Sequence, residues 1–378
     1  MNEISLKNFE LLKNACRARA PSNIALVKYW GKRDSEQQWP ANDSLSMTLS
    51  TAYTDTLAAV GSGTDQVQRG GALASDATVE RALRHLQYLR KQTGFSAPIV
   101  IGSDNTFPAS AGIASSASGF AALTIAALGA WTGAPNMASL DQMGWGRDRL
   151  AHMARMGSGS AGRSLFGGFA HWSAGASASE QAVFAPFDAS HWPLSDLIFV
   201  FHSGPKTVSS SKAHAWAQSS PLFQIRLAGL PSRLQRTLSA IKRRDILGLG
   251  IEIEAEALEM HAVMMTSSPS VCYISSETSQ FIAALRAKRD SEALPCWFTL
   301  DAGPNVHVIC ETAHEQAVYD ALAPVAGECF AQKAGGSGGR EGTGHERQKL
   351  TILRDHIGSG PTLTPLMHPN LTNTHSHS

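Results

Sequence analysis

The sequence predicts an α+β fold with two domains. Short apolar segments typical of strands and longer amphipathic segments typical of helices are mixed along the chain without strict alternation. The 378 residues are enough for two hydrophobic cores. A new apolar strand follows the break at Trp192-Pro193. We therefore predict one domain at residues 1–195, a second at 196–361 and a separate tail at 362–378.

The first predicted domain combines short strands with amphipathic helices. Val79, Leu83 and Leu86 keep helical spacing and Asp76 is a suitable N-cap, so residues 76–93 are predicted to form a helix. Strands are predicted at 24–27, 44–49 and 97–101, and further helices at 120–130 and 140–156.

The second predicted domain begins with an apolar strand at 197–201. Helices are predicted at 231–247, 251–265, 280–289 and 313–323, and strands at 297–300 and 306–310 around the turn 301–305. Residues 333–344 are rich in glycine and are predicted to be a linker or insertion, after which 349–357 resumes a helical pattern. The tail 362–378 lacks apolar periodicity, so we expect it to be disordered.

Charge and cysteine content restrict the class of protein. The formal net charge of +1 gives no indication of binding to nucleic acid or to an acidic membrane, so an anionic ligand must meet a local cluster of cations. The longest apolar run, 120–131, is too short to span a membrane, and residues 1–14 lack the apolar core of a signal peptide. Five scattered cysteines without a C-x-x-C pair fit reduced thiols. We expect a soluble, cytoplasmic protein.

The run PASAGIASSASG at 108–119 is the strongest functional signal. Small residues let backbone N–H groups approach a ligand, and the helix that follows offers unpaired N–H groups and its positive dipole end to an anion. Ser115, Ser116 and Ser118 add hydroxyl donors. Phosphate suits this pattern, although a tightly packed loop without a ligand has the same composition.

Two other motif matches lack the context that their function requires. GSGSAG at 157–162 has the spacing of the dinucleotide-binding fingerprint, but it follows a predicted helix where that fingerprint follows a strand. GGSGG at 335–339 has the spacing of a nucleophile elbow but no flanking strand. No P-loop motif is present. Any nucleotide is therefore held by another kind of loop.

Cations gather with hydroxyls at two further places. Lys28, Tyr29 and Lys32 follow the first predicted strand, where two lysines and a phenol suit a multiply charged anion; solvated lysines at a strand end are the alternative. Arg163 follows the serines of 157–162, and a guanidinium binds carboxylate or phosphate through two parallel hydrogen bonds.

The second half of the chain adds a hydroxyl cluster and one carboxylate. SSSK at 209–212 again places serines beside a cation. Asp301 follows the apolar strand 297–300 and precedes Gly303. A carboxylate in that position is either a turn former or a fixed acid or base.

These motifs together resemble the diphosphomevalonate decarboxylase family of the GHMP kinase superfamily. The matching segments are APSNIALVKYWGKRD at 20–34, DSLSMTLS at 43–50, NTFPASAGIASSASGFAAL at 105–123, GSGSAGRSLFGG at 157–168, TLDAGPN at 299–305 and GSGP at 358–361. They span most of the chain in the family's order. The phosphate loop is shared by the superfamily, whereas NIALVKYWGK, GSGSAxRS and DAGPN together are specific to this branch.

The resemblance implies a GHMP kinase-like fold. Its N-terminal half is like domain 2 of ribosomal protein S5, its C-terminal half is ferredoxin-like, and the active site lies in the cleft between them. In the implied reaction, ATP phosphorylates the 3-hydroxyl of mevalonate 5-diphosphate. Phosphate and CO₂ then leave, giving isopentenyl diphosphate and ADP in the mevalonate pathway. The resemblance also implies Mg²⁺ and a homodimer, and no nucleic-acid, membrane or protein-held metal partner is expected.

The resemblance also implies roles for the residues of this chain that stand at the positions of the family's site residues. The resemblance implies catalytic roles for Asp301 at the 3-hydroxyl, Lys28 beside the reacting centre and Arg163 on the substrate carboxylate. The implied substrate-binding residues are Asn23, Tyr29, Lys32, Ser158, Ser160, Arg163 and Ser210. The implied ATP-binding residues are Ser110, Gly112, Ala114, Ser115, Ser116 and Ser118.

The chain departs from the family's pattern at two places, and three alternative functions remain. Gly162 stands where the family usually has cysteine or another small residue, and the insertion 333–344 has no known role. The alternatives are a mevalonate 3-kinase of the same fold, a phosphomevalonate decarboxylase and a catalytically silent nucleotide-binding homologue. Retention of Asp301 and Arg163 argues against the first and the last. The sequence does not decide between the monophosphate and the diphosphate.

Overall fold

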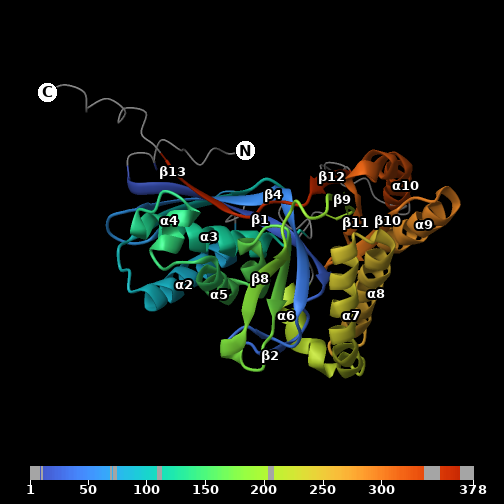
Figure 1. Cartoon of the computed structure of the whole chain (residues 1–378), viewed down its shortest axis with the longest axis horizontal. Coiled ribbons are helices and arrows are strands. Elements are labelled where there is room, and N and C mark those ends of the chain that lie inside the picture. Colours follow the sequence, from blue (N-terminus) through green and yellow to red (C-terminus); the bar gives the residue numbers. More distant parts are fainter. Residues whose placement is uncertain are drawn as a thin grey trace.

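Two mainly antiparallel sheets, each covered by helices, make up the fold (Figure 1). The computed structural model describes residues 9, 12–68, 70, 75–108, 113–202, 208–335 and 350–366, except for the side chains of 332–335. The mixture of helices and antiparallel strands confirms the predicted α+β class. No helix in these described ranges is long and apolar enough to cross a membrane.

The first sheet has seven strands, five of them in the order β13-β1-β4-β6-β5. β7 pairs with the first part of β4, and β8 pairs with β7. The strands are β1 (Lys13–Val27), β4 (Ser44–Val60), β5 (Gln66–Gln68), β6 (Ile99–Asn105), β7 (Phe169–Ser173), β8 (Ala182–Phe187) and β13 (Thr362–Pro365). The second half of β1 is buried on both faces, which explains its continuous apolar run.

Helices cover one face of this sheet, as Figure 1 shows. They are α2 (Asp76–Thr93), α3 (Ser115–Thr132), α4 (Met137–Gln142) and α5 (Arg147–Gly157), followed by the 3-10 helix η2 (Gly159–Leu165). α3 is buried along almost its whole length and lies at the centre of this half. The helix predicted at 140–156 is two helices, because Gly144 in the left-handed region (φ 83°) and Gly146 separate them. The N-cap of α2 is Ser75, one residue before the predicted Asp76.

The second sheet has the order β10-β11-β9-β12. Its strands are β9 (Leu194–Val200), β10 (Cys296–Leu300), β11 (Val306–Glu311) and β12 (Thr351–His356). The helices of this half are α6 (Ser210–Trp216), α7 (Phe223–Arg243), α8 (Ile246–Met265), α9 (Ser276–Glu292) and α10 (Glu315–Gly335). The short elements are β2 (Lys32–Asp34), β3 (Trp39–Pro40), η3 (Ala178–Glu180), η4 (Ala217–Ser219) and η5 (Thr312–His314).

One hydrophobic cluster joins the two halves. It contains Leu26 of β1 and Met47 of β4 together with Ile198 of β9, Leu234 of α7 and Ile253 of α8. Because residues of both sheets share this core, the end of β1 is fixed against the helices of the second half.

Two predictions for the C-terminal part are wrong. Residues 349–357 were expected to be helical, but 351–356 form β12, which pairs antiparallel with β9. Residues 362–365, expected in a disordered tail, form β13 beside β1 and return the chain to the first sheet. Only Leu363 of that strand is buried in the core, too little for a periodic signal. The remaining tail residues 367–378 and most of the predicted linker lie outside the described residues.

We expect Leu363→Ala to lower the free energy of unfolding by about 2–3 kcal/mol, because the side chain is 2% exposed and packs against α3. Thr364→Ala, on the exposed face of the same strand, is the control and should change stability by less than about 0.5 kcal/mol. Urea unfolding of both variants measures the difference. Equal stability of the two would show that β13 does not contribute to the core.

Candidate active site

A cavity of about 110 Å³ lies between the two halves of the molecule. The first half contributes the end of β1, the start of α3 and η2; the second contributes α6, α8 and the turn after β10. Its lining residues are Ala25, Lys28, Tyr29, Trp30, Ala114, Ser116, Ser160, Arg163, Ser210, His214, Met260, Asp301 and Ala302. Residues from both halves are therefore needed to form it.

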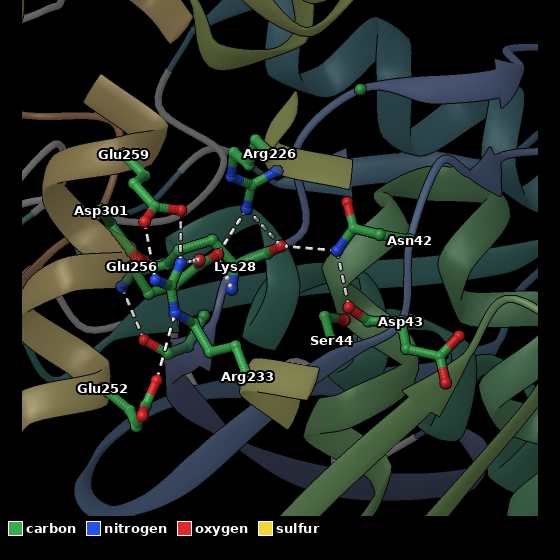
Figure 2. A network of polar contacts seen from close by, with 12 residues as sticks. Lys28, Asn42, Asp43, Ser44, Arg226, Arg233, Glu252, Glu256, Glu259 and Asp301 are labelled. Atoms are coloured by element: carbon green, nitrogen blue, oxygen red, sulfur yellow. Dashed lines mark hydrogen bonds and ion pairs between the residues drawn. The ribbon is translucent and has the colours of Figure 1, made fainter. Parts of the chain in front are cut away.

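Lys28 and Asp301, which both line this cavity, form an ion pair. Lys28 comes directly after β1, its side chain is 1% exposed, and its Nζ donates to Oδ1 of Asp301 over 2.9 Å. The same Nζ donates to the carbonyl of Ala25 over 2.6 Å. These two acceptors fix the ammonium position. Figure 2 shows Lys28 and Asp301 meeting beside the acidic residues of α8.

The turn that carries Asp301 is held by backbone and side-chain hydrogen bonds. The N–H of Gly303 donates to the carbonyl of Asp301 over 2.7 Å, and Nε2 of His261 lies 3.1 Å from the same oxygen. Asn305 accepts from the N–H of His202 and donates to its carbonyl, which ties the turn to the end of β9. Asp301 is thus a rigidly placed carboxylate.

Asp301 is held in its ionised form. Burial by itself favours the neutral acid, but the electrostatic influence of Lys28, His307 and Arg163 and the hydrogen bond from Lys28 together outweigh it. The pKa of Asp301 therefore lies below its ordinary value of 3.8. The side chain keeps 23% exposure, so a ligand can reach the carboxylate.

Arg163 is a buried cation held by neutral groups. Its Nε donates to Asn23 over 3.3 Å and to Ser46 over 3.1 Å, and its Nη1 donates to Ser44 over 2.6 Å. Burial lowers the pKa of Arg163 to about 10, which leaves it charged at neutral pH. Among the described residues, none of its hydrogen bonds goes to a carboxylate. A carboxylate or phosphate ligand can therefore supply the missing negative charge.

The start of α3 also lines the cavity, through Ala114 and Ser116. Ser116 is exposed, and its hydroxyl lies 3.1 Å from that of Ser158. Ala114, which caps the helix, has a left-handed conformation with φ 41°, a conformation unusual for a residue with a Cβ. The helix N-terminus and its hydroxyl suit an anion.

Five lining residues escaped the sequence analysis: Ala25, Trp30, His214, Met260 and Ala302. His214 is the polar one among them. Its Nδ1 accepts from the N–H of Gly31 over 3.1 Å, and its ring packs on Tyr29 and Trp30. Burial lowers the pKa of His214 to about 3, so the ring is neutral. Its spacing of four residues from Ser210 on one helix face could have indicated it.

Not every predicted site residue reaches the cavity. Asn23 accepts a hydrogen bond from Arg163 but is not among the residues that line the cavity. Ser118 is fully buried, and its hydroxyl lies 2.7 Å from that of Thr54. Lys32 lines a separate neighbouring cavity of about 700 Å³, and burial lowers its pKa. Ser115 and Ser158 lie beside the lining residues without being among them. The predictions for Ser110 and Gly112 lie outside the described residues.

We expect Lys28→Met to raise the pKa of Asp301, because the largest opposing charge is lost and burial is less well compensated. Ionised Asp301 stabilises the fold above its unfolded-state pKa, and this contribution disappears as the pH falls through its lower folded-state pKa. In Lys28→Met, this stabilising contribution of Asp301 is lost at a higher pH than in the parent protein. Carboxyl ¹³C NMR titration measures the pKa, with Lys32→Met as the control. An unchanged pKa in Lys28→Met would contradict the pairing.

Family models match both halves of the chain. The model described as the diphosphomevalonate decarboxylase-like N-terminal domain matches residues 20–184. The model described as the mevalonate 5-diphosphate decarboxylase C-terminal domain matches residues 196–346. Together they include every residue of the cavity.

Curated relatives and solved structures agree with these matches. The diphosphomevalonate decarboxylase of Debaryomyces hansenii is 34% identical, with 81% of each chain covered. The mevalonate diphosphate decarboxylase structure from Staphylococcus aureus is 31% identical, with a TM-score of 0.77, covering 92% of this chain and 97% of that one. A structure described as MDDEF in complex with MVAPP, AMPPCP and magnesium is 31% identical, with a TM-score of 0.78, covering 93% and 99%. These similarities extend over the whole two-domain fold, and the chain belongs to the diphosphomevalonate decarboxylase family.

Proposed function

We propose that the chain catalyses the ATP-dependent decarboxylation of mevalonate 5-diphosphate to isopentenyl diphosphate, ADP, phosphate and CO₂. One observation carries the proposal: Asp301, paired with Lys28, lines the same cavity as Arg163 and the start of α3. A carboxylate base, a site for the substrate carboxylate and a site for the phosphates of ATP thus lie around one cavity.

Asp301 acts on the 3-hydroxyl. A tertiary alcohol is a poor nucleophile, and transfer of the γ-phosphoryl group requires that its oxygen be aimed and its proton removed. The ionised carboxylate of Asp301 accepts that proton as transfer proceeds. Lys28 holds the carboxylate in place and in its ionised form.

Arg163 acts on the substrate carboxylate. Its guanidinium is buried, charged and bonded only to neutral oxygens in the described part of the chain, so a substrate carboxylate completes its pairing. The interaction orients the group that leaves as CO₂. Charge stabilisation near this cation also helps the departure of phosphate from C3.

ATP binds with its phosphates at the start of α3. Ser116 and the backbone after Ala114 offer hydrogen-bond donors there, and the helix dipole favours the negative charge. Within the described ranges no three His, Cys, Asp or Glu side chains form a metal site, which suits an ion held mainly by phosphates and water. Bound Mg²⁺ would neutralise phosphate charge. A relative's structure contains AMPPCP and magnesium.

Tyr29, Ser160 and Ser210 are the remaining polar groups for the diphosphate end of the substrate. All three line the cavity. The phenol oxygen of Tyr29 is buried without a hydrogen-bond partner among the described residues, and burial raises its pKa, so it stays protonated and available as a donor. The roles of Lys32 and Ser158 remain predictions.

An end-point assay tests the function. Mevalonate 5-phosphate and 5-diphosphate are each incubated with ATP, and ADP and CO₂ are measured separately. We expect ADP and CO₂ in equal amounts from the diphosphate only. ADP without CO₂ would indicate a 3-kinase, products from the monophosphate alone a phosphomevalonate decarboxylase, and no product from either a silent homologue.

A cytoplasmic location is also part of the proposal. All five cysteines are free, which supports a reducing compartment such as the cytoplasm. A homodimer is part of the proposal on the resemblance alone, and light scattering of the purified protein tests it.

A further inference from the structure

A buried network of charges between α7 and α8 ends on the backbone of Lys28 (Figure 2). The N–H of Lys28 donates to Oε1 of Glu256 over 3.0 Å, and Nη2 of Arg226 donates to the carbonyl of Lys28 over 3.2 Å. Arg226 and Glu256 also form an ion pair with each other. Asn42 donates a further hydrogen bond to the same carbonyl over 2.9 Å. We name Arg226, Glu256 and Asn42 the Lys28 clamp.

The clamp replaces the hydrogen bonds that a strand would supply. Lys28 lies one residue beyond β1, so its N–H and carbonyl have no sheet partner. Buried backbone groups need partners, and here two charged side chains and one amide provide them. The backbone at Lys28 is therefore fixed by tertiary contacts: Arg226 and Glu256 come from the second half of the molecule and Asn42 from the first.

Burial of the charged side chains of the clamp costs desolvation free energy. Glu256 is 0% exposed and Arg226 is 4% exposed. Nε and Nη1 of Arg226 have no hydrogen-bond partner among the described residues. A buried ion pair with incomplete hydrogen bonding contributes little to stability compared with apolar side chains of similar volume. The geometry of the clamp therefore favours a role in positioning Lys28 over a role in stabilising the fold.

Further ion pairs hold Glu256 in place. Nη1 of Arg233 donates to Oε2 of Glu256 over 2.9 Å, and Nη2 of Arg233 donates to Glu259 over 2.7 Å. Arg233 also contacts Glu252, which pairs with Arg236 at the surface. The carboxylate that receives the N–H of Lys28 thus bonds two arginines.

We propose that Glu256 and Arg226 are positioning residues of the reaction: they fix the peptide groups of Lys28 and so keep its ammonium on Asp301. The inference rests on the proposed function of the cavity. Neither residue lines the cavity, so both act through Lys28. A displacement of about 1 Å at a reacting group can cost ~10²-fold in rate.

The double variant Arg226→Met/Glu256→Leu tests the inference. Replacing both members of a buried pair with apolar groups avoids an uncompensated charge between them, and Arg233 retains Glu252 and Glu259. We expect kcat to fall by ~10²-fold, the KM for ATP to stay within about threefold, and the acid limb of the kcat–pH profile to move to higher pH. The limb moves because Lys28 no longer lowers the pKa of Asp301 fully.

The pH readout must be assigned to the right groups. The charged or titratable groups that face Asp301 are Lys28 after β1, Arg163 of η2, His307 of β11 and Asp196 of β9. His261 of α8 contacts its backbone carbonyl. The double variant leaves all five side chains unchanged, so a shift in the acid limb reports the position of Lys28.

Glu259→Gln is the matched control. Glu259 lies on α8 like Glu256 and bonds Arg233, but it does not contact Lys28. Glu259→Gln should keep kcat within about twofold and leave the acid limb unmoved. A folded double variant with the parent's acid limb overturns the inference, whether or not its kcat has fallen. If the double variant does not fold, Arg226→Lys gives the same readouts, with a smaller expected loss because it keeps the charge.

The test also separates this inference from the proposed function. If the parent chain forms neither ADP nor CO₂, the proposed function fails. The clamp then still predicts a higher pKa for Asp301 in the double variant than in the parent and in Glu259→Gln. Carboxyl ¹³C NMR measures that pKa without any reaction, and equal values would overturn the clamp.

Discussion

The ion pair between Lys28 and Asp301 is the interaction on which the site depends. It joins the end of β1, in the first sheet, to the turn after β10, in the second. A buried ammonium is stabilised only when hydrogen bonds fix its position, and the carbonyl of Ala25 and the carboxylate of Asp301 provide them. The shared hydrophobic cluster keeps the two halves at the distance this pair requires. Fold and chemistry are therefore linked at one contact.

The positive and negative charges around the cavity do not balance. Lys28 and Arg163 are cations, while Asp301 is the one carboxylate among the described residues that line the cavity. The neutral ring of His214 adds no positive charge, because burial holds its pKa near 3. The described lining thus has an excess of positive charge. An anionic substrate brings the balancing charge, which favours its binding over that of a neutral analogue.

The sequence predicted the parts of the site that lie in short contiguous motifs. Lys28, Arg163 and Asp301 each stand directly after or inside a regular element, so their neighbours in sequence indicated their position. Ser118 shows the limit of this reasoning: on α3 it points away from Ser116 and bonds Thr54 inside the core. The phosphate-loop pattern does not distinguish which serine lines the cavity.

The clamp and the last strand could not be predicted in this way. Arg226 and Arg233 are seven residues apart, and Glu252, Glu256 and Glu259 follow helical spacing, a pattern typical of a solvated face. Only the pairing of α7 with α8 and the end of β1 buries Arg226, Arg233 and Glu256, while Glu259 stays exposed. Similarly, β13 contributes a single buried leucine, and its partner strand lies more than three hundred residues earlier in the chain.

Turnover of the folded Asp301→Asn variant tests the central claim most directly. Asparagine keeps the shape and suits the turn after β10, but it lacks the charge and basicity needed to accept the proton of the 3-hydroxyl. ATP binding, measured by titration calorimetry, controls for an intact site. The account predicts a loss of ~10²–10⁴-fold in kcat with ATP binding retained. Turnover within a few-fold of the parent would contradict it and leave Asp301 as a turn-forming residue.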